Sequence, residues 1–249
     1  MEKIKVGAVS YLNTKPLLYG LKRSGLMDKI VLSEDYPSNV AAQLSDNKID
    51  IGLVPVAIIP TIAQSKIVCD YGIATNGKVA SVCIFSKVPM EEITHVMLDY
   101  QSRTSVKLAQ WLLKNYWQKE VVFEKATNGY ELTIGDTKAA VIIGDRALDL
   151  YYDFPYVYDL GEAWVKATRL PFVFAAWVAN KPIDEAFVDA FNRANAYGLL
   201  HFEEIIRELP ELRYPILTYY KENICFELGE QQKKGMQLFL NEIKANYFY

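Results

Sequence analysis

Hydroxyl side chains cluster in the segment Ser102-Arg103-Thr104-Ser105, and apolar residues at helical spacing follow it. This pattern predicts a helix that begins at the cluster. Free backbone N–H groups, the positive end of the helix dipole and hydroxyl donors all favour a bound carboxylate or phosphate there. The same residues also suit ordinary capping, by Ser102 or Thr104, with Arg103 in solvent. An anion site that includes Ser105 and simple capping are both open interpretations.

A second junction of this kind opens the chain. The apolar run from Ile4 to Val9 predicts a buried strand, and a polar loop that contains Ser10 and Tyr11 follows it. Thr14 suits a helix N-cap, with a proline in the first turn behind it. Open α/β sheets bind ligands where strands end in such loops. Ser10 and Tyr11 are therefore candidate ligand contacts, although the segment equally suits a unit that only builds the sheet.

Three further residues lie beside apolar runs, where a ligand cleft would have its mouth. Asn13 and Ser81 are neutral and polar, and Pro55 ends the apolar run 49–56. Backbone groups at the end of that run would face the same crevice as the opening loop. Hydrogen bonding within turns is the alternative role for Asn13 and Ser81.

Gly144 and Asp145 end another apolar run, and a short helix is predicted after them. Gly144 can offer a backbone N–H to a ligand, whereas Asp145 suits either the ligand site or a helix cap. Tyr11, Trp164 and Phe174 are aromatic residues that can wall a ring-shaped ligand. Such residues are more commonly part of the core.

Composition excludes several classes of function. The 249 residues carry a net charge of −3 with no Lys/Arg stripe, which argues against nucleic acid as a partner. The sequence contains two histidines, three scattered cysteines, and no Walker, GxGxxG or HExxH motif, so no metal or cofactor is predicted. The opening residues pass into a strand without a signal-peptide core, and no apolar run is long enough for a bilayer. We therefore expect a soluble, cytoplasmic protein without a membrane partner, either monomer or homodimer.

The predicted elements form two α/β units. Strands and helices alternate over 4–56, and the pattern restarts over 95–146. Long apolar runs at 79–86 and 170–179 suit crossings between the units, and the last helices would pack on the first. We predict two lobes, each a mostly parallel sheet flanked by helices, with a cleft between them. Lobe 1 comprises 1–83 and 176–249, and lobe 2 comprises 84–175.

At this point the residues resemble a known family. Ser10-Tyr11-Leu12-Asn13-Thr14-Lys15-Pro16-Leu17 looks like the N-terminal motif of the chorismate dehydratases of the futalosine route to menaquinone. The likeness continues, in order, at 50–56, 81–86, 99–105, 143–148, 170–175 and 223–229. Each piece alone is weak, but the ordered set covers nearly the whole chain. Two departures are Arg169, where a glycine is expected before Leu-Pro-Phe, and Cys83, where an aliphatic residue is more common.

The resemblance implies a fold similar to type II periplasmic binding proteins, and dehydration of the small anionic substrate chorismate to 3-(1-carboxyvinyloxy)benzoate. Asn13 and Ser81 match positions implicated in catalysis. Asn13 would orient the substrate or its leaving hydroxyl, and Ser81 would hydrogen-bond that hydroxyl or a carboxylate. Thr104 and Ser105 would hold the other carboxylate with their N–H groups, and a substrate carboxylate can itself take the proton.

Two rival functions remain open on the sequence alone. One is the later enzyme of the same pathway, which makes 1,4-dihydroxy-6-naphthoate from a cyclic futalosine derivative. The other is a cytoplasmic solute-binding or sensor protein that turns nothing over. The Ser-Tyr-Leu-Asn opening favours the dehydratase.

Overall fold

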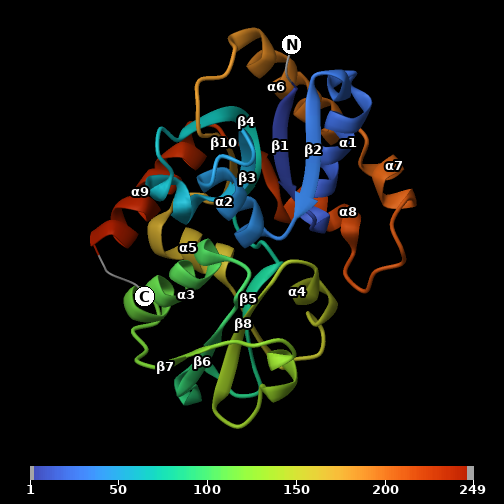
Figure 1. The fold of residues 1–249 in the computed structure, drawn as a ribbon. Helices are drawn as coiled ribbons and strands as arrows, with labels where there is room; N and C mark the ends of the chain where they lie inside the picture. Colours follow the sequence, from blue (N-terminus) through green and yellow to red (C-terminus); the bar gives the residue numbers. More distant parts are fainter. Residues whose placement is uncertain (1–2, 246–249) are drawn as a thin grey trace.

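The computed structural model describes residues 3–245 as two β-sheets with helices packed around them (Figure 1). The larger sheet has the strand order β11-β4-β10-β3-β1-β2, and the smaller has the order β7-β6-β8-β5-β9. Figure 1 shows the larger sheet above and the smaller below, with chain crossing between them. Residues 1–2 and 246–249, which we had assigned to lobe 1, lie outside the described residues.

The strands of the larger sheet are β1 (Ile4–Val9), β2 (Ile30–Asp35), β3 (Ile51–Pro55), β4 (Lys66–Thr75), β10 (Phe172–Ala179) and β11 (Cys225–Glu227). Those of the smaller sheet are β5 (Val82–Ser86), β6 (His95–Leu98), β7 (Val122–Lys125), β8 (Lys138–Ile143) and β9 (Tyr156–Asp159). The α-helices are α1 (Lys15–Arg23), α2 (Pro37–Ser45), α3 (Arg103–Asn115), α4 (Asp145–Asp149), α5 (Leu160–Thr168), α6 (Glu185–Leu199), α7 (Phe202–Arg207), α8 (Ile216–Thr218) and α9 (Glu230–Ala245). Short helical turns are η1 (Leu12–Thr14), η2 (Leu26–Asp28), η3 (Val56–Thr61), η4 (Met90–Glu92), η5 (Tyr130–Thr133) and the π-helix η6 (Tyr219–Asn223).

Both sheets are mixed, but most strands of each share one direction, and the exceptions are β10 and β11 in the larger sheet and β5 in the smaller. β1 runs parallel to β2 and β3, and β6 runs parallel to β7 and β8. In contrast, β10 is antiparallel to β3 and β4, and β5 is antiparallel to β8 and β9. β5 and β10 receive the chain as it arrives from the other sheet. Because each starts at the edge where neighbouring strands end, it must run against those strands.

The crossings lie between strands rather than inside them. The first spans 76–81, after β4 and before β5, and the second spans 169–171, between α5 and β10. The boundaries 83/84 and 175/176 would therefore cut β5 and β10, each of which belongs wholly to one sheet. We propose that the two crossings bound the lobes, with lobe 2 between them and lobe 1 on either side.

Arg169 occupies the backbone position where the resemblance led us to expect glycine. It caps the end of α5 in the left-handed conformation, with φ of 64°. This conformation costs an L-residue energy and is the usual reason for glycine at a helix end. Its side chain is exposed, so the departure changes the local strain without reaching the cleft.

Helices of the C-terminal part pack on the larger sheet and its helices. α6 contacts α1 and β4, and α9 contacts β10. The α1–α6 contact is very close, because a Cβ at Gly198 would lie 1.8 Å from the Pro16 carbonyl oxygen. This contact fixes α1, whose first turn follows the opening loop. In the described part of the chain, no helix combines the length and apolar character needed to cross a membrane.

Candidate active site

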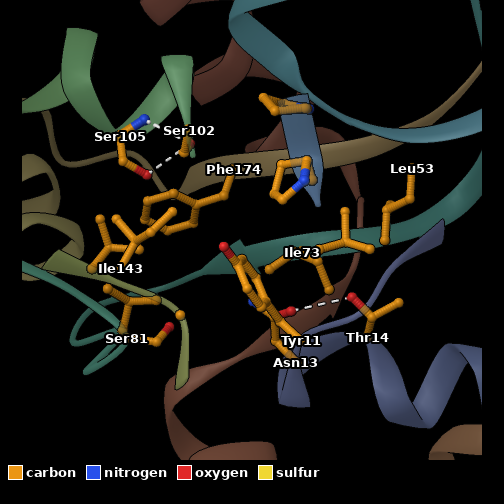
Figure 2. Close-up of a pocket in the computed structure, with 17 residues that line it drawn as sticks. Tyr11, Asn13, Thr14, Leu53, Ile73, Ser81, Ser102, Ser105, Ile143 and Phe174 are labelled. Atoms are coloured by element: carbon orange, nitrogen blue, oxygen red, sulfur yellow. Dashed lines mark hydrogen bonds between the residues drawn. The ribbon is translucent and has the colours of Figure 1, made fainter. Parts of the chain in front are cut away.

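A cavity lies between the two sheets, where strands from both end and the chain crosses (Figure 2). Its empty space is about 520 Å³, part of it open to solvent. Eight of the predicted site residues line it: Tyr11, Asn13, Pro55, Ser81, Ser102, Ser105, Gly144 and Phe174. Apolar side chains such as Leu53, Ile73 and Ile143 complete the wall. The predicted positions thus converge from both lobes.

Three predicted residues do not line the cavity. Ser10 is exposed, and its backbone N–H donates to Asp35 of the neighbouring strand. Thr104 is fully buried, and its hydroxyl accepts the N–H of Ala57 across the lobes (3.1 Å). Asp145 also spans the lobes, since its carboxylate accepts the N–H of Leu12 (3.0 Å).

Trp164 does not wall the cavity either. Its ring is fully buried in an aromatic cluster, with centroids 4.9 Å from Trp111, 5.2 Å from Phe172 and 5.8 Å from Phe239. Phe172 in turn packs against Phe174, whose ring reaches the cavity. Trp164 therefore supports the wall from the core.

Asn13 sits in η1, the short turn between β1 and α1. The Thr14 hydroxyl donates to the Asn13 side-chain oxygen (3.2 Å). Thr14 occupies the predicted N-cap position of α1, but its side chain makes no capping bond to the helix. With the oxygen of Asn13 engaged, its NH2 group is the part of the amide left to donate into the cavity.

Ser81 ends the first crossing, in a tight turn centred on Ala80. Its N–H donates to the Val79 carbonyl (2.7 Å), and Ala80 has a φ of 60°, which is strained for an L-residue. The buried Asp159 carboxylate accepts the N–H groups of Val79 (3.0 Å) and Ala80 (2.6 Å). Burial raises the pKa of Asp159, while these backbone donors oppose the rise. The turn holds Ser81 at the cavity with 1% of its surface exposed.

Gly144 faces Tyr11 across the cavity edge. A Cβ at Gly144 would lie 3.1 Å from the Tyr11 ring, and its φ of 65° also favours glycine. Its N–H donates to the Ser81 carbonyl (2.8 Å), so the expected donation of this group to a ligand is wrong. The bond continues the β5–β8 ladder beyond its last pair.

The start of α3 contributes Ser102 and Ser105, which lie together in Figure 2. Ser102 is the N-cap, and its hydroxyl oxygen accepts the Ser105 N–H (3.3 Å) and the Ser105 hydroxyl (3.1 Å). The capping interpretation is therefore confirmed for Ser102. Because its N–H is engaged, Ser105 does not present that group as we expected.

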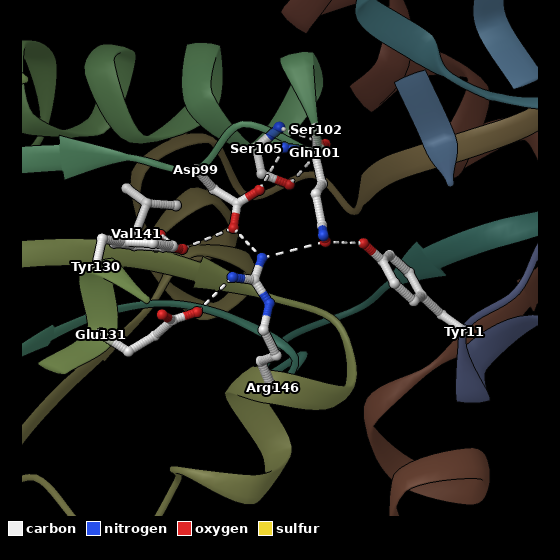
Figure 3. A network of polar contacts seen from close by, with 9 residues as sticks. All are labelled: Tyr11, Asp99, Gln101, Ser102, Ser105, Tyr130, Glu131, Val141 and Arg146. Carbon is white, nitrogen blue, oxygen red and sulfur yellow. Dashed lines mark hydrogen bonds and ion pairs between the residues drawn. The ribbon is translucent and has the colours of Figure 1, made fainter. Parts of the chain in front are cut away.

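None of the described residues that line the cavity is charged. A cationic network behind the wall belongs to Arg146, which pairs with Asp99 and Glu131 (Figure 3). Burial alone would lower the pKa of Arg146. The neighbouring Asp99, Tyr130 and Glu131 raise it by more than burial lowers it, so the pKa lies above its ordinary value and the guanidinium stays charged. The starts of α1 and α3 do reach the cavity, at Thr14 and at Ser102, and the positive end of a helix dipole favours an anion there.

The Arg146 network reaches the cavity wall through Gln101. The Gln101 side-chain oxygen accepts Arg146 Nη2 (3.1 Å) and also the Tyr11 hydroxyl from the other lobe. Burial raises the pKa of Tyr11 above its ordinary value, so this phenol remains a donor. Tyr11, together with the bonds of Asp145 and Thr104, joins the lobes around the cavity.

Sequence reasoning missed several residues that shape the site. Gln101 and Asp159 act through hydrogen bonds to residues far along the chain, and no local pattern marks those bonds. Thr14 was expected only as a cap, and its bond to the neighbouring Asn13 was missed. Asp159 does precede a helix and caps it through the Glu162 N–H (2.9 Å). That signal predicts Asp159 as a helix cap, but it does not predict the bonds that Asp159 accepts from Val79 and Ala80 in the first crossing.

Comparison with known proteins gives the family. A family model described as menaquinone biosynthesis matches residues 4–245. Curated proteins named chorismate dehydratase are similar: one from Thermus thermophilus is 28% identical over 96% of this chain and 94% of its own, and one from Campylobacter jejuni is 27% identical over 96% and 97%. A solved Candida albicans protein described as having the generic periplasmic binding protein fold matches with a TM-score of 0.66 at 12% identity, covering 100% of this chain and 92% of that one. The two-lobed binding-protein fold is thereby confirmed, and the chain belongs to the menaquinone biosynthesis family.

Proposed function

We propose that this protein is a chorismate dehydratase, which removes water from chorismate to give 3-(1-carboxyvinyloxy)benzoate. Membership of the menaquinone biosynthesis family supports this, as do the names of the two relatives that match nearly its full length. The observation that carries the proposal is an uncharged cavity where Asn13 and Ser81 from lobe 1 meet Ser102 and Ser105 from lobe 2.

Such a cavity suits a dianionic substrate. Chorismate has two carboxylates and a ring hydroxyl, and it presents a flat unsaturated ring. Phe174 and Ile143 offer apolar surface for the ring, while the hydroxyls and the start of α3 offer donors for a carboxylate. The helix N-termini of the two lobes point their positive ends at the cavity, which offsets part of the substrate charge.

The chemistry demands little acid or base strength from the protein. The reaction breaks a ring C–H bond and the ring C–OH bond, and the proton and hydroxide leave together as water. Because the product ring is aromatic, the reaction is driven strongly forward. A carboxylate of the substrate takes the ring proton and passes it to the departing hydroxide, which leaves as water. This route agrees with a cavity lined by no ionised described residue.

Asn13 and Ser81 then act as hydrogen-bond donors. The NH2 group of Asn13 and the hydroxyl of Ser81 stabilise the departing hydroxide and hold the ring in the reactive orientation. Donors fixed by the surrounding fold do not have to reorganise as charge develops. Thr14 and the strained Ala80 turn supply that fixation.

We also propose that the protein works in the cytoplasm, without a cofactor, where its substrate would be available. The direct test is to incubate purified protein with chorismate and to identify the product by mass spectrometry. We expect stoichiometric conversion to the aromatic ether. Binding of chorismate without conversion would favour a sensor, and turnover of the cyclic futalosine derivative alone would favour the naphthoate enzyme.

A further inference from the structure

A tyrosine hidden behind the cavity contacts both proposed catalytic side chains, Ser81 and Asn13. Tyr219 is 1% exposed, and its hydroxyl donates to the Ser81 hydroxyl oxygen (2.8 Å). Tyr219 does not itself line the cavity. It therefore contacts the site only through its neighbours.

The backbone around Tyr219 is built to hold the ring in place. Tyr219 begins the π-helix η6, in which the Ile224 N–H donates to the Tyr219 carbonyl (3.0 Å). Such one-turn π-helices are uncommon and occur frequently at functional sites. The next residue, Tyr220, is also buried and donates to the Leu12 carbonyl (3.0 Å), beside Asn13. The two tyrosines thus brace both segments that carry the proposed catalytic residues.

The direction of the hydrogen bond decides what Ser81 can do. A serine hydroxyl donates one hydrogen bond and accepts up to two. Desolvation raises the pKa of Tyr219 well above its ordinary value, so the phenol keeps its proton. The geometry of the contact makes Tyr219 the donor and the Ser81 oxygen the acceptor. Ser81 is then the acceptor in this bond, and its own proton must point elsewhere. Among residues 3–245 no acceptor is found for that proton, and the open direction is the cavity.

We propose that Tyr219 is a positioning residue that orients the Ser81 hydroxyl as a donor to the substrate. This inference rests on the proposed dehydratase function. A bond accepted by the Ser81 oxygen also polarises its O–H group and strengthens its donation. Without Tyr219, the Ser81 hydroxyl would rotate among several directions, and only some of them would serve the leaving hydroxide.

The test is a double-mutant cycle with Tyr219→Phe and Ser81→Ala, measured as kcat and KM for chorismate. Phenylalanine keeps the ring and the packing, so we expect Tyr219→Phe to fold. It should lower kcat about tenfold, equivalent to about 1.4 kcal/mol, with KM within twofold. In the Ser81→Ala background the same change should lower kcat by clearly less than in the wild type, because only the contact of Tyr219 with Asn13 is then left to lose.

Tyr214→Phe is the matched control, since it also removes a buried hydroxyl, one that donates to Asn223 (3.0 Å). It should lower the melting temperature about as much as Tyr219→Phe and leave kcat unchanged. The positioning role alone would be overturned if Tyr219→Phe lowered kcat equally with and without Ser81→Ala. It would also be overturned if Tyr219→Phe lowered kcat no more than Tyr214→Phe does. Absence of chorismate turnover by the wild-type protein would overturn the proposed function, and this inference with it.

Discussion

Removing one hydroxyl should loosen the closed arrangement of the two lobes. Tyr11→Phe deletes the bond from Tyr11 to Gln101, which joins lobe 1 to lobe 2 at the cavity edge (Figure 3). Gln101 itself stays in place, because Arg146 Nη2 still donates to its oxygen (3.1 Å). The net contribution of one such bond is about 1 kcal/mol, a factor of about five in an equilibrium constant.

If substrate binds the closed state, that loss should appear in affinity. We expect Tyr11→Phe to raise KM for chorismate about fivefold and to leave kcat within twofold. Solution scattering should show less compaction of the variant than of the wild type at equal subsaturating chorismate. Gln101→Ala removes the acceptor from the other side, and adding Tyr11→Phe to it should have no further effect on KM.

The reasoning fails if the Tyr11 hydroxyl acts on the substrate directly. In that case Tyr11→Phe would lower kcat, and it would do so equally with and without Gln101→Ala. An unchanged KM in Tyr11→Phe would also contradict the closing role, because the bond would then contribute nothing to the closed state.

Three further predictions concern stability. Gly198→Ala should lower the free energy of unfolding by about 2 kcal/mol in denaturant titration, because the new Cβ meets the α1 backbone, whereas Gly77→Ala, with open space, should change it little. Arg169→Gly should raise the free energy of unfolding by about 1 kcal/mol, since glycine relieves the left-handed strain at the end of α5. Asp145→Asn should raise the free energy of unfolding more at pH 8 than at pH 4. Burial raises the pKa of Asp145 in the folded state above its value in the unfolded chain. The wild type therefore becomes less stable as pH rises through the folded pKa, whereas asparagine does not ionise and escapes this loss.

Each of these has a clear contrary outcome. Equal melting of the Gly198→Ala and Gly77→Ala variants would mean that α1 and α6 can separate at little cost. A destabilised Arg169→Gly variant would show that the arginine contributes more than its backbone strain removes. A stability difference for Asp145→Asn that is constant across pH would mean that Asp145 ionises normally in the fold.

The sequence predicted the elements better than their orientation. The run from Ile4 to Val9 and the helix behind Pro16 form as expected, because apolar periodicity and a proline in the first turn act locally. The direction of β5 and β10 was missed, because strand direction depends on where the chain arrives from, and periodicity is identical for both directions.

In the site, too, residues with a local sequence pattern were predicted, and contacts between distant segments were not. Ser102 was found because a cap and the helix behind it leave a local pattern. Thr14 was found as the N-cap of α1 for the same reason, but the bond from its hydroxyl to Asn13 was not predicted, because the intervening turn η1 leaves no local pattern. Tyr219 lies far along the chain from Ser81, and its ring meets that residue only once the C-terminal segment has folded back on lobe 1.

The central claim is that neutral hydrogen-bond donors held by the fold carry out the dehydration. The most direct measurement is kcat on chorismate for the wild type, Asn13→Ala and Ser81→Ala at saturating substrate. Removing one such donor at a reacting centre typically lowers kcat on the order of 10²-fold, and we expect a loss of that size in each variant, with intact folding by circular dichroism. Wild-type turnover by both variants would contradict the claim.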